Sequence, residues 1–212
     1  MNYSTVKVPS TFPPSSRPVY IFPVADMTYK NKDIAWPKIA AGLSEISQRT
    51  PGRILVHTVS YDLTDYLRRQ LSQEISNVPR LVTYTKANER QRALDIYLAN
   101  LGSILLAPSL DRGIDLPDND CDAIVVCKVP YPSLGDKQIS ARMHTHGGQL
   151  WYSVQTIRNL VQMTGRGMRH QNDQCDSYIL DRQFVTNIWK KNRALIPKWW
   201  SDALIWDGGR LI

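Results

Sequence analysis

The chain has 212 residues, which is enough for one sizeable domain with its own hydrophobic core. Hydrophobic residues make up 42% and charged residues 21%, a balance that excludes a disordered or a fibrous protein. The net charge of +7 favours an anionic partner, and nucleic acid is the first candidate. We find neither a signal-peptide pattern nor an apolar run of the roughly 18 residues that a membrane span needs. We therefore expect an intracellular, cytoplasmic protein without a membrane partner.

The residues that most often bind metals are sparse in this sequence. Cys121, Cys127 and Cys175 are too few and too widely spaced for a disulfide framework or a zinc site. Cys121 and Cys127 bracket an apolar run, so we expect both to be buried thiols. His144 and His146 are two residues apart, but no third ligand stands at a telling distance. The sequence therefore predicts no metal site.

Pattern and punctuation divide the chain into three parts. Residues 1–50 contain a proline-rich stretch, expected to be an extended connector arm, and then a helix that Thr50-Pro51-Gly52 ends. Residues 51–185 alternate between strand and helix patterns. Residues 186–212 carry several tryptophans and are expected to form a helix and a tail. Strands are expected near residues 54–60, 81–84, 104–106, 123–129 and 178–180.

Most of these strand candidates are continuous apolar runs rather than alternating ones. Such runs are typical of parallel strands that helices cover on both faces. The sequence therefore predicts an α/β doubly wound domain. We expect Asp62 to cap the helix after the first strand, Asn88 with Gln91 to start the next, and a long helix from about Gln149.

Ligands of open parallel sheets bind beyond the carboxyl ends of the strands, so we examined the segments that follow each strand. The first, residues 57–61, offers hydroxyls and an aromatic ring for a phosphate and a base, or is a plain strand end with a helix cap. Its His57 is expected to be a satisfied core residue. The second carries Gly113 and Asp115, a combination that is common in any loop.

The long helix carries the most informative pattern. Arg158, Gln162, Arg166 and Arg169 recur on one side of it, away from the apolar stripe, and no acidic residue follows until Asp173. Guanidinium groups in such a row match phosphate oxygens, and we expect them to face outward at the strand tips. The alternative is an ordinary surface helix of a basic protein.

Two common nucleotide-hydrolysis motifs are missing from the sequence. No GxxxxGK[ST] stretch is present to cradle phosphates, and no Asp-Glu pair is present to hold Mg²⁺ and position water. A chain of this kind cannot hydrolyse a nucleoside triphosphate alone. It could supply arginine fingers to another domain that binds the triphosphate.

Three stretches resemble helicase motifs in the order expected for one family. They read ILVHTVSY (54–61), LLAPSLDRGIDLP (105–117) and LVQMTGRGMRHQNDQCDSYILD (160–181). The first two are similar to motifs IV and V, and the spacing of Gln162, Gly165, Arg166 and Arg169 is similar to motif VI. Together with VPYPSLGD (129–136), they resemble the second motor domain of superfamily 2 helicases of the XPD/DinG type. The resemblance covers nearly the whole chain.

The resemblance implies a RecA-like α/β fold, a parallel sheet flanked by helices, without the phosphate-binding loop. It further implies an ATP-dependent DNA helicase whose ATP and Mg²⁺ are held mainly by a first motor domain, in the same polypeptide or a separate subunit. Arg166 and Arg169 would reach the γ-phosphate as arginine fingers, and Gln162 would support the same contact. This chain alone is then expected to be inactive.

Other positions take their expected roles through the same resemblance. At one of them the chain departs from the family, because Arg112 stands where an acidic residue usually precedes the motif V glycine. The nucleotide would lie near Gly113, Asp115 and Gly165, and single-stranded DNA would contact Ser60, Tyr61, Tyr84 and Ser109.

Two other functions remain open from the sequence. One is a stand-alone nucleic-acid-binding module without ATPase activity, which would bind single strands in a salt-sensitive way. The other is an interaction domain whose basic face docks an acidic protein. The proline-rich start is expected of a chain that begins just after the first motor domain.

Overall fold

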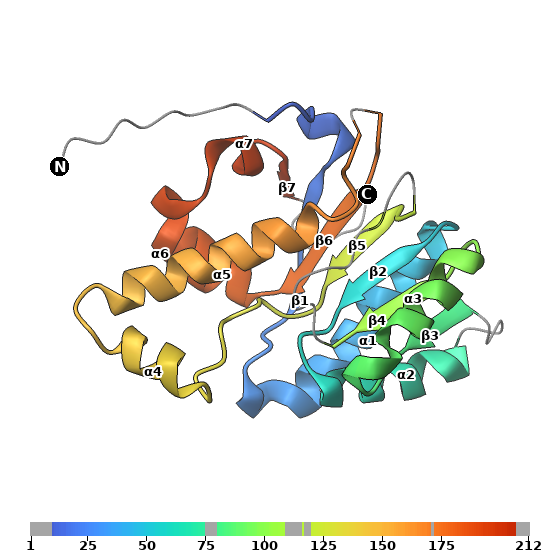
Figure 1. Ribbon diagram of the computed structural model, residues 1–212, viewed down its shortest axis with the longest axis horizontal. Helices are drawn as coiled ribbons and strands as arrows, with labels where there is room; N and C mark the ends of the chain where they lie inside the picture. Colours follow the sequence, from blue (N-terminus) through green and yellow to red (C-terminus); the bar gives the residue numbers. More distant parts are fainter. Residues whose placement is uncertain (1–9, 75–79, 109–115, 117–119, 171, 207–212) are drawn as a thin grey trace.

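The computed structural model describes residues 10–74, 80–108, 116, 120–170 and 172–206. Seven strands form one sheet in the order β3-β4-β2-β5-β6-β1-β7 (Figure 1), and every pair of neighbouring strands runs parallel. The strands are β1 (Val19–Ala25), β2 (Ile54–His57), β3 (Leu81–Thr83), β4 (Ile104–Ala107), β5 (Ala123–Val126), β6 (Asp176–Asp181) and β7 (Leu204–Trp206). The predicted parallel α/β sheet is confirmed.

Helices connect the strands and cover both faces of the sheet. The α-helices are α1 (Lys32–Arg49), α2 (Tyr61–Glu74), α3 (Arg90–Ala99), α4 (Lys137–Met143), α5 (Gly148–Thr164), α6 (Lys190–Asn192) and α7 (Lys198–Ser201). A π-helix (Phe184–Trp189) and 3₁₀ turns at Pro14–Ser16, Tyr29–Asn31, Ala87–Glu89 and Arg193–Leu195 also lie within the described residues. Within the described part, no helix combines the length and the apolar character that crossing a bilayer requires.

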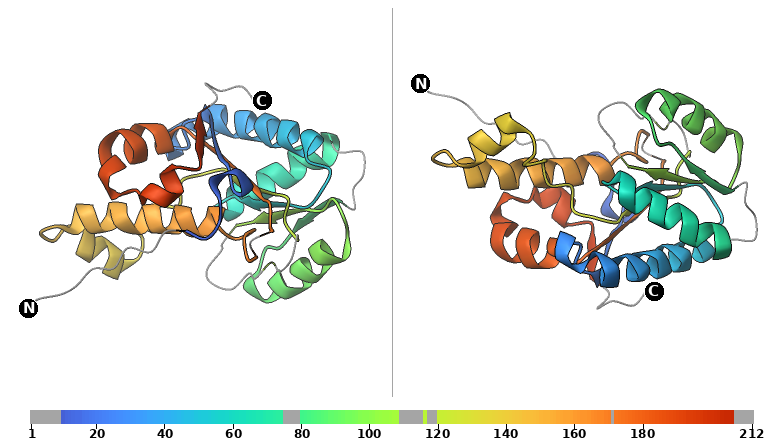
Figure 2. Two further views of the ribbon diagram at one scale, coloured as in Figure 1. Left: turned by 90° about the horizontal axis from the view of Figure 1, so that it is seen from above. Right: turned by 90° about the horizontal axis from the view of Figure 1, so that it is seen from below.

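Two hydrophobic layers hold the sheet between its helices. Helices α1 and α2 cover one face, and α3 and α5 cover the other (Figure 2). Successive residues of a strand point to opposite faces, so Ile54 and Val56 pack under α1 and α2 while Leu55 packs under α3 and α5. Burial of each such side chain stabilises the fold by roughly 1.5–3 kcal/mol. This two-sided burial explains the continuous apolar runs in the sequence.

The sheet extends beyond the boundaries expected from the sequence. Residues 19–25 form β1, which lies between β6 and β7, so the expectation of a connector arm is wrong for residues 19–23. Pro23 is tolerated because the β1–β6 register shifts between Ile21 and Ala25. Residues 204–206 form β7, where a helix and a tail were expected. Both strands depend on long-range pairing that local patterns do not show.

Two helix starts also differ from the sequence predictions. Helix α3 begins at Arg90 after a 3₁₀ turn, so Asn88 is not its cap; the Glu89 carboxylate instead accepts the Thr85 and Lys86 backbone N–H groups. Helix α2 begins at Tyr61. There the Ser60 hydroxyl oxygen, rather than Asp62, accepts the Leu63 N–H at 3.4 Å.

Candidate functional site

The arginine-bearing segment, residues 165–170, lies at the amino-terminal edge of the sheet (Figure 1). Thr164 ends α5, and its carbonyl oxygen accepts the Ser177 hydroxyl at 3.3 Å, at the start of β6. The expectation that these arginines face the carboxyl tips of the strands is therefore wrong. A helix that follows a parallel strand runs back along the sheet, so it ends where the next strand begins.

Close packing against the core fixes the course of this segment. A Cβ atom built on Gly167 would lie 2.3 Å from Cys175 Sγ, so only glycine fits there without a shift. A hydrogen bond with Cys121, together with burial, raises the pKa of the Cys175 thiol. Cys121, Cys127 and Cys175 are all buried and free, which confirms the prediction of buried thiols for Cys121 and Cys127. The segment thus packs against the buried Cys175 side chain.

Asp173 shapes the turn that follows the arginines. Its Oδ2 atom accepts the Arg169 and His170 backbone N–H groups at 2.5 and 2.6 Å. These hydrogen bonds lower the pKa of the carboxyl group, which is buried. Asp173 therefore orders the backbone of the arginine segment.

The row of polar residues predicted along the long helix is only partly continuous. Arg158 and Gln162 are exposed on α5, and Arg169 is exposed beyond its end. Arg166 is half-buried, because the helix ends at Thr164 and the chain turns toward the sheet. The prediction that all the guanidinium groups face outward is wrong for Arg166.

The pKa of His57 indicates where the guanidinium of Arg166 lies. This residue ends β2 and is fully buried, as predicted for a core residue. Burial and, to a smaller extent, the charge of the Arg166 guanidinium together lower the pKa of His57 to about 3, against a smaller opposing effect of the Met163 backbone. No described residue offers either ring nitrogen a hydrogen bond of good geometry, so His57 is not the satisfied residue expected. Arg166 therefore turns toward the face under α3 and α5.

A second group of polar residues lies at the carboxyl-terminal edge. The Thr58 N–H donates to the Ala107 carbonyl at 3.1 Å, and the Cys127 N–H donates to the His57 carbonyl at 3.0 Å. These bonds join the tips of β4, β2 and β5. Between β2 and α2, Val59 has a φ of 58°, a left-handed conformation that costs a β-branched residue of order 1–3 kcal/mol.

Asp181 ties three strand ends together at the same edge. Its carboxylate accepts the backbone N–H groups of Met27 at 3.2 Å and of Val129 and Gln183 at 2.9 Å. Burial nevertheless raises the pKa of Asp181 to about 6, against the opposite effect of these bonds. The carboxyl edge is therefore a rigid platform between β1, β5 and β6.

Cationic and aromatic side chains surround a small cavity on this platform. The cavity has a volume of about 100 Å³, and its lining includes Tyr29, Lys32, Trp36, Ser60 and Lys128. The neighbouring Tyr61 is 45% exposed. Ammonium and hydroxyl groups suit phosphate oxygens, and exposed aromatic rings suit stacked bases.

Of the remaining residues predicted to contact DNA or nucleotide, one is buried in the core and three lie outside the described part of the chain. Tyr84 is 2% exposed and packs in the core under α3 and α5, so the prediction that it contacts DNA is wrong. The Tyr84 ring, which was expected to contact DNA, packs against apolar side chains instead. Ser109, Gly113 and Asp115 lie outside the described residues and stay predictions.

Sequence reasoning missed several residues of the carboxyl edge. Lys128 lies two residues after the end of β5, so the rule that ligands bind beyond strand ends could have found it. Lys32 reaches the same cavity from the start of α1, which no local signal indicates. Within the described ranges, no three His, Cys, Asp or Glu side chains are grouped to hold a metal ion.

A family model described as the helicase C-terminal domain matches residues 43–203. This chain belongs to the helicase C-terminal domain family. The match covers most of the sheet and both edges described above. The resemblance to the second motor domain of XPD-type helicases, and the RecA-like fold that it implied, are confirmed.

Curated relatives of this helicase C-terminal domain are longer proteins. The chain is 27% identical over 185 residues to the ATP-dependent DNA helicase XPD of Sulfolobus acidocaldarius, a match covering 79% of this chain and 32% of the relative. It is 21% identical over 201 residues to the regulator of telomere elongation helicase 1 homolog of Caenorhabditis elegans, covering 78% and 20%. The chain thus spans a third or less of these relatives.

Solved structures share the fold of this helicase C-terminal domain. S. tokodaii Xpd4 aligns with a TM-score of 0.62 and 16% identity, over 90% of this chain and 38% of that chain. The C-terminal domain of S. cerevisiae Dbp5 aligns with a TM-score of 0.52 and 15% identity, over 90% and 89%. The second comparison shows that the shared fold spans almost all of a separately solved C-terminal domain.

Proposed function

We propose that this chain is the second motor domain of an ATP-dependent DNA helicase. In this role it supplies arginine fingers to ATP held by a first motor domain, and it grips single-stranded DNA. The family match carries the proposal, together with the arginine segment that is ordered at one edge of the sheet. The chain itself lacks a phosphate-binding loop, so hydrolysis needs the other domain.

Arg166 and Arg169 are the proposed arginine fingers, with Gln162 and Gly165 beside them. Their support comes from a backbone fixed by Gly167 packing and by the Asp173 carboxylate, because a preorganised donor stabilises a transition-state charge best. When bound by the first motor domain, ATP with Mg²⁺ supplies the scissile phosphate. This chain would contribute guanidinium N–H donors, and its surface would exclude water.

The proposed DNA contacts lie at the opposite, carboxyl edge of the sheet. Ser60 lines the same cavity as Lys32 and Lys128, and the exposed Tyr61 is the next residue in the chain, so hydroxyl and ammonium groups converge beside an exposed ring. The strained Val59 supports a functional role, because such strain persists where the surroundings impose it. In this proposal, the nucleotide and the DNA strand contact opposite edges of the same sheet.

The ATPase proposal is tested by adding the first motor domain of the same helicase, made separately, to this chain. The chain alone should show no ATPase activity, and the pair should show activity that single-stranded DNA stimulates. Arg166→Ala and Arg169→Ala should each lower the rate by roughly 10³-fold or more. Arg69→Ala is the matched control, because Arg69 is exposed and pairs only with Asp65 in the described part. Restored activity that survives both finger substitutions contradicts the assignment.

DNA binding by the carboxyl edge is tested with a fluorescent single-stranded oligonucleotide. Tyr61→Ala should weaken binding by about tenfold if the ring stacks on a base, and Tyr61→Phe should bind almost normally. Equal binding by both variants and the unchanged chain would exclude this contact. Full-strength binding by the chain alone, with no effect of nucleotide or partner in the reconstituted pair, would favour the stand-alone binding module.

A further inference from the structure

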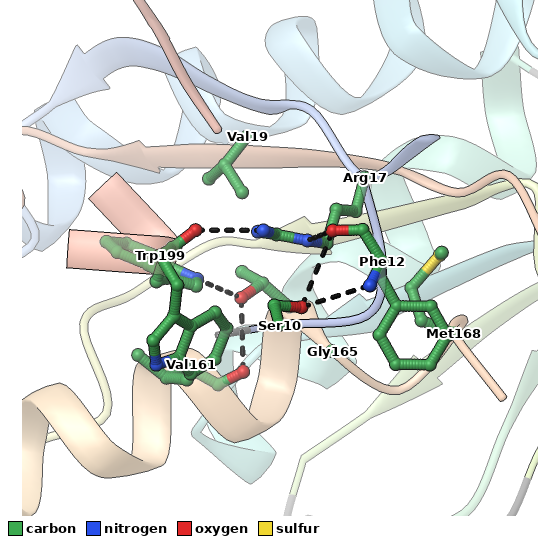
Figure 3. Close-up of a pocket in the computed structure, with 10 residues that line it drawn as sticks. Ser10, Phe12, Arg17, Val19, Val161, Gly165, Met168 and Trp199 are labelled. Atoms are coloured by element: carbon green, nitrogen blue, oxygen red, sulfur yellow. Dashed lines mark hydrogen bonds between the residues drawn. The ribbon is translucent and has the colours of Figure 1, made fainter. Parts of the chain in front are cut away.

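A second, larger cavity lies at the amino-terminal edge, beside the arginine segment. It has a volume of about 410 Å³ and is walled by α5, α7, the start of β1 and the segment before it (Figure 3). Its apolar lining includes Phe12, Val161, Met168 and Trp199. A cavity of this size and character is in the range that holds a small ligand. We call it the Arg17 pocket after its charged residue.

Arg17 is the feature of this pocket that apolar packing does not explain. Arg17 is 8% exposed, yet within the described part its guanidinium donates hydrogen bonds only to the carbonyl oxygens of Phe12 at 3.1 Å and Trp199 at 2.8 Å (Figure 3). No carboxylate of the described part forms an ion pair with it. A guanidinium has five N–H donors, so several remain for another acceptor. Burial lowers the pKa of Arg17, which shows the cost of its desolvation.

The other polar groups of the pocket are already engaged. Ser10 Oγ accepts the Phe12 N–H at 3.2 Å, and Thr164 Oγ1 accepts the Trp200 Nε1–H at 2.9 Å. The pocket therefore presents aromatic and aliphatic walls with one set of unused cationic donors. Trp199, whose ring lies 5.4 Å from the Arg17 Cζ atom, is still 39% exposed and offers a surface for stacking.

The chemistry of the pocket lining restricts the class of ligand that can bind there. A small inorganic anion would satisfy Arg17 but leave the apolar walls uncovered, and a hydrocarbon would leave the guanidinium donors without acceptors. A flat nitrogen heterocycle meets both demands, because its face stacks on indole and phenyl rings while its ring nitrogens accept N–H groups. We propose that the Arg17 pocket binds the base of a nucleotide, a choice that rests on the proposed function.

Position favours a free nucleotide over a DNA strand as the source of the base. Gly165 lines the pocket, and Arg166, the proposed phosphate contact, is the next residue. A nucleotide seated by its base in the pocket would extend its phosphates along the arginine segment. The proposed DNA contacts at Ser60 and Tyr61 lie at the opposite edge of the sheet.

The test uses the full chain and follows the six tryptophan indole N–H signals by NMR during titrations. Adenosine should shift the Trp199 signal in a saturable way and leave Trp151, which lies at the other end of α5, unmoved. Trp199→Ala should weaken adenosine binding, followed at Trp200, by about tenfold, and Trp151→Ala should not. Arg17→Lys keeps the charge but loses the planar fork, and should weaken binding as well.

The outcomes separate this inference from the proposed function. An unshifted Trp199 signal with adenosine, beside ATPase activity that depends on Arg166, overturns the pocket and leaves the helicase role standing. A Trp199 shift with adenosine, but no ATPase activity in the reconstituted pair, supports the pocket and overturns the proposed helicase role. A shift with a thymidine oligonucleotide, but with neither adenosine nor an abasic oligonucleotide, assigns the pocket to a strand and overturns the free-nucleotide assignment. Binding of the first motor domain alone at Trp199, with no nucleoside effect, also overturns it.

Discussion

Replacing the buried histidine of β2 should change how stability depends on pH. His57 has a pKa of about 3 in the folded chain, against the ordinary histidine value of 6.5 in the unfolded chain. A histidine with a lowered pKa contributes stability above its unfolded pKa and loses that contribution as the pH falls. Acidification from about pH 7 to about pH 5 protonates the ring only in the unfolded chain. The expected loss from His57 is about 2 kcal/mol.

The matched variant is His57→Leu, which removes the titrating ring and also the two ring nitrogens that lack good partners. The free energy of unfolding should be measured by urea denaturation across this pH range for both proteins. The wild-type curve alone is not diagnostic, because Asp181, with a pKa near 6, gains stability as the pH falls. The difference between variant and wild type cancels this effect and should grow by about 2 kcal/mol toward acid.

A difference that stays constant with pH would refute the reasoning, because it would mean that His57 is hydrated in the folded chain. The position of Arg166 is tested on the same residue. Removing its charge by Arg166→Gln should raise the pKa of His57, which an NMR titration of the imidazole can follow. An unchanged pKa would show that the guanidinium points away from β2.

Three further substitutions test the two edges of the sheet. Asp181→Asn should remove the contribution by which Asp181 stabilises the wild type as the pH falls through about 6, so the variant should lose stability relative to the wild type toward acid, measured by thermal unfolding at a series of pH values. Gly167→Ala should cost about 1–3 kcal/mol through its clash with Cys175, whereas Gly135→Ala, with only ordinary contacts, should change chemical denaturation little. At Val59, the glycine variant should be more stable than the alanine variant by about 1 kcal/mol, the reverse of the usual order, because only glycine adopts a φ of 58° without strain; the usual order in urea denaturation would contradict this.

The sequence by itself determined the layer architecture and the family. Strands such as β2 and β5 are buried on both faces, so their residues are apolar except for His57, and that pattern is visible locally. The motif VI spacing is also local, because Gln162, Arg166 and Arg169 lie within one helix and the turn after it. The prediction that helical spacing places Arg166 on the outward face was wrong, because α5 ends at Thr164 and Arg166 turns toward the core.

Only the tertiary structure decided which edge of the sheet each group occupies. The pairing of β1 with β6 and β7 joins segments far apart in the chain, and its energy comes from long-range hydrogen bonds that leave no local period. The burial of Tyr84 and the Arg17 pocket also depend on long-range packing. Arg17, for example, contacts Trp199, which lies 182 residues later in the sequence. A local pattern fixes which face of an element is apolar, but the surroundings of a polar side chain depend on every element packed around it.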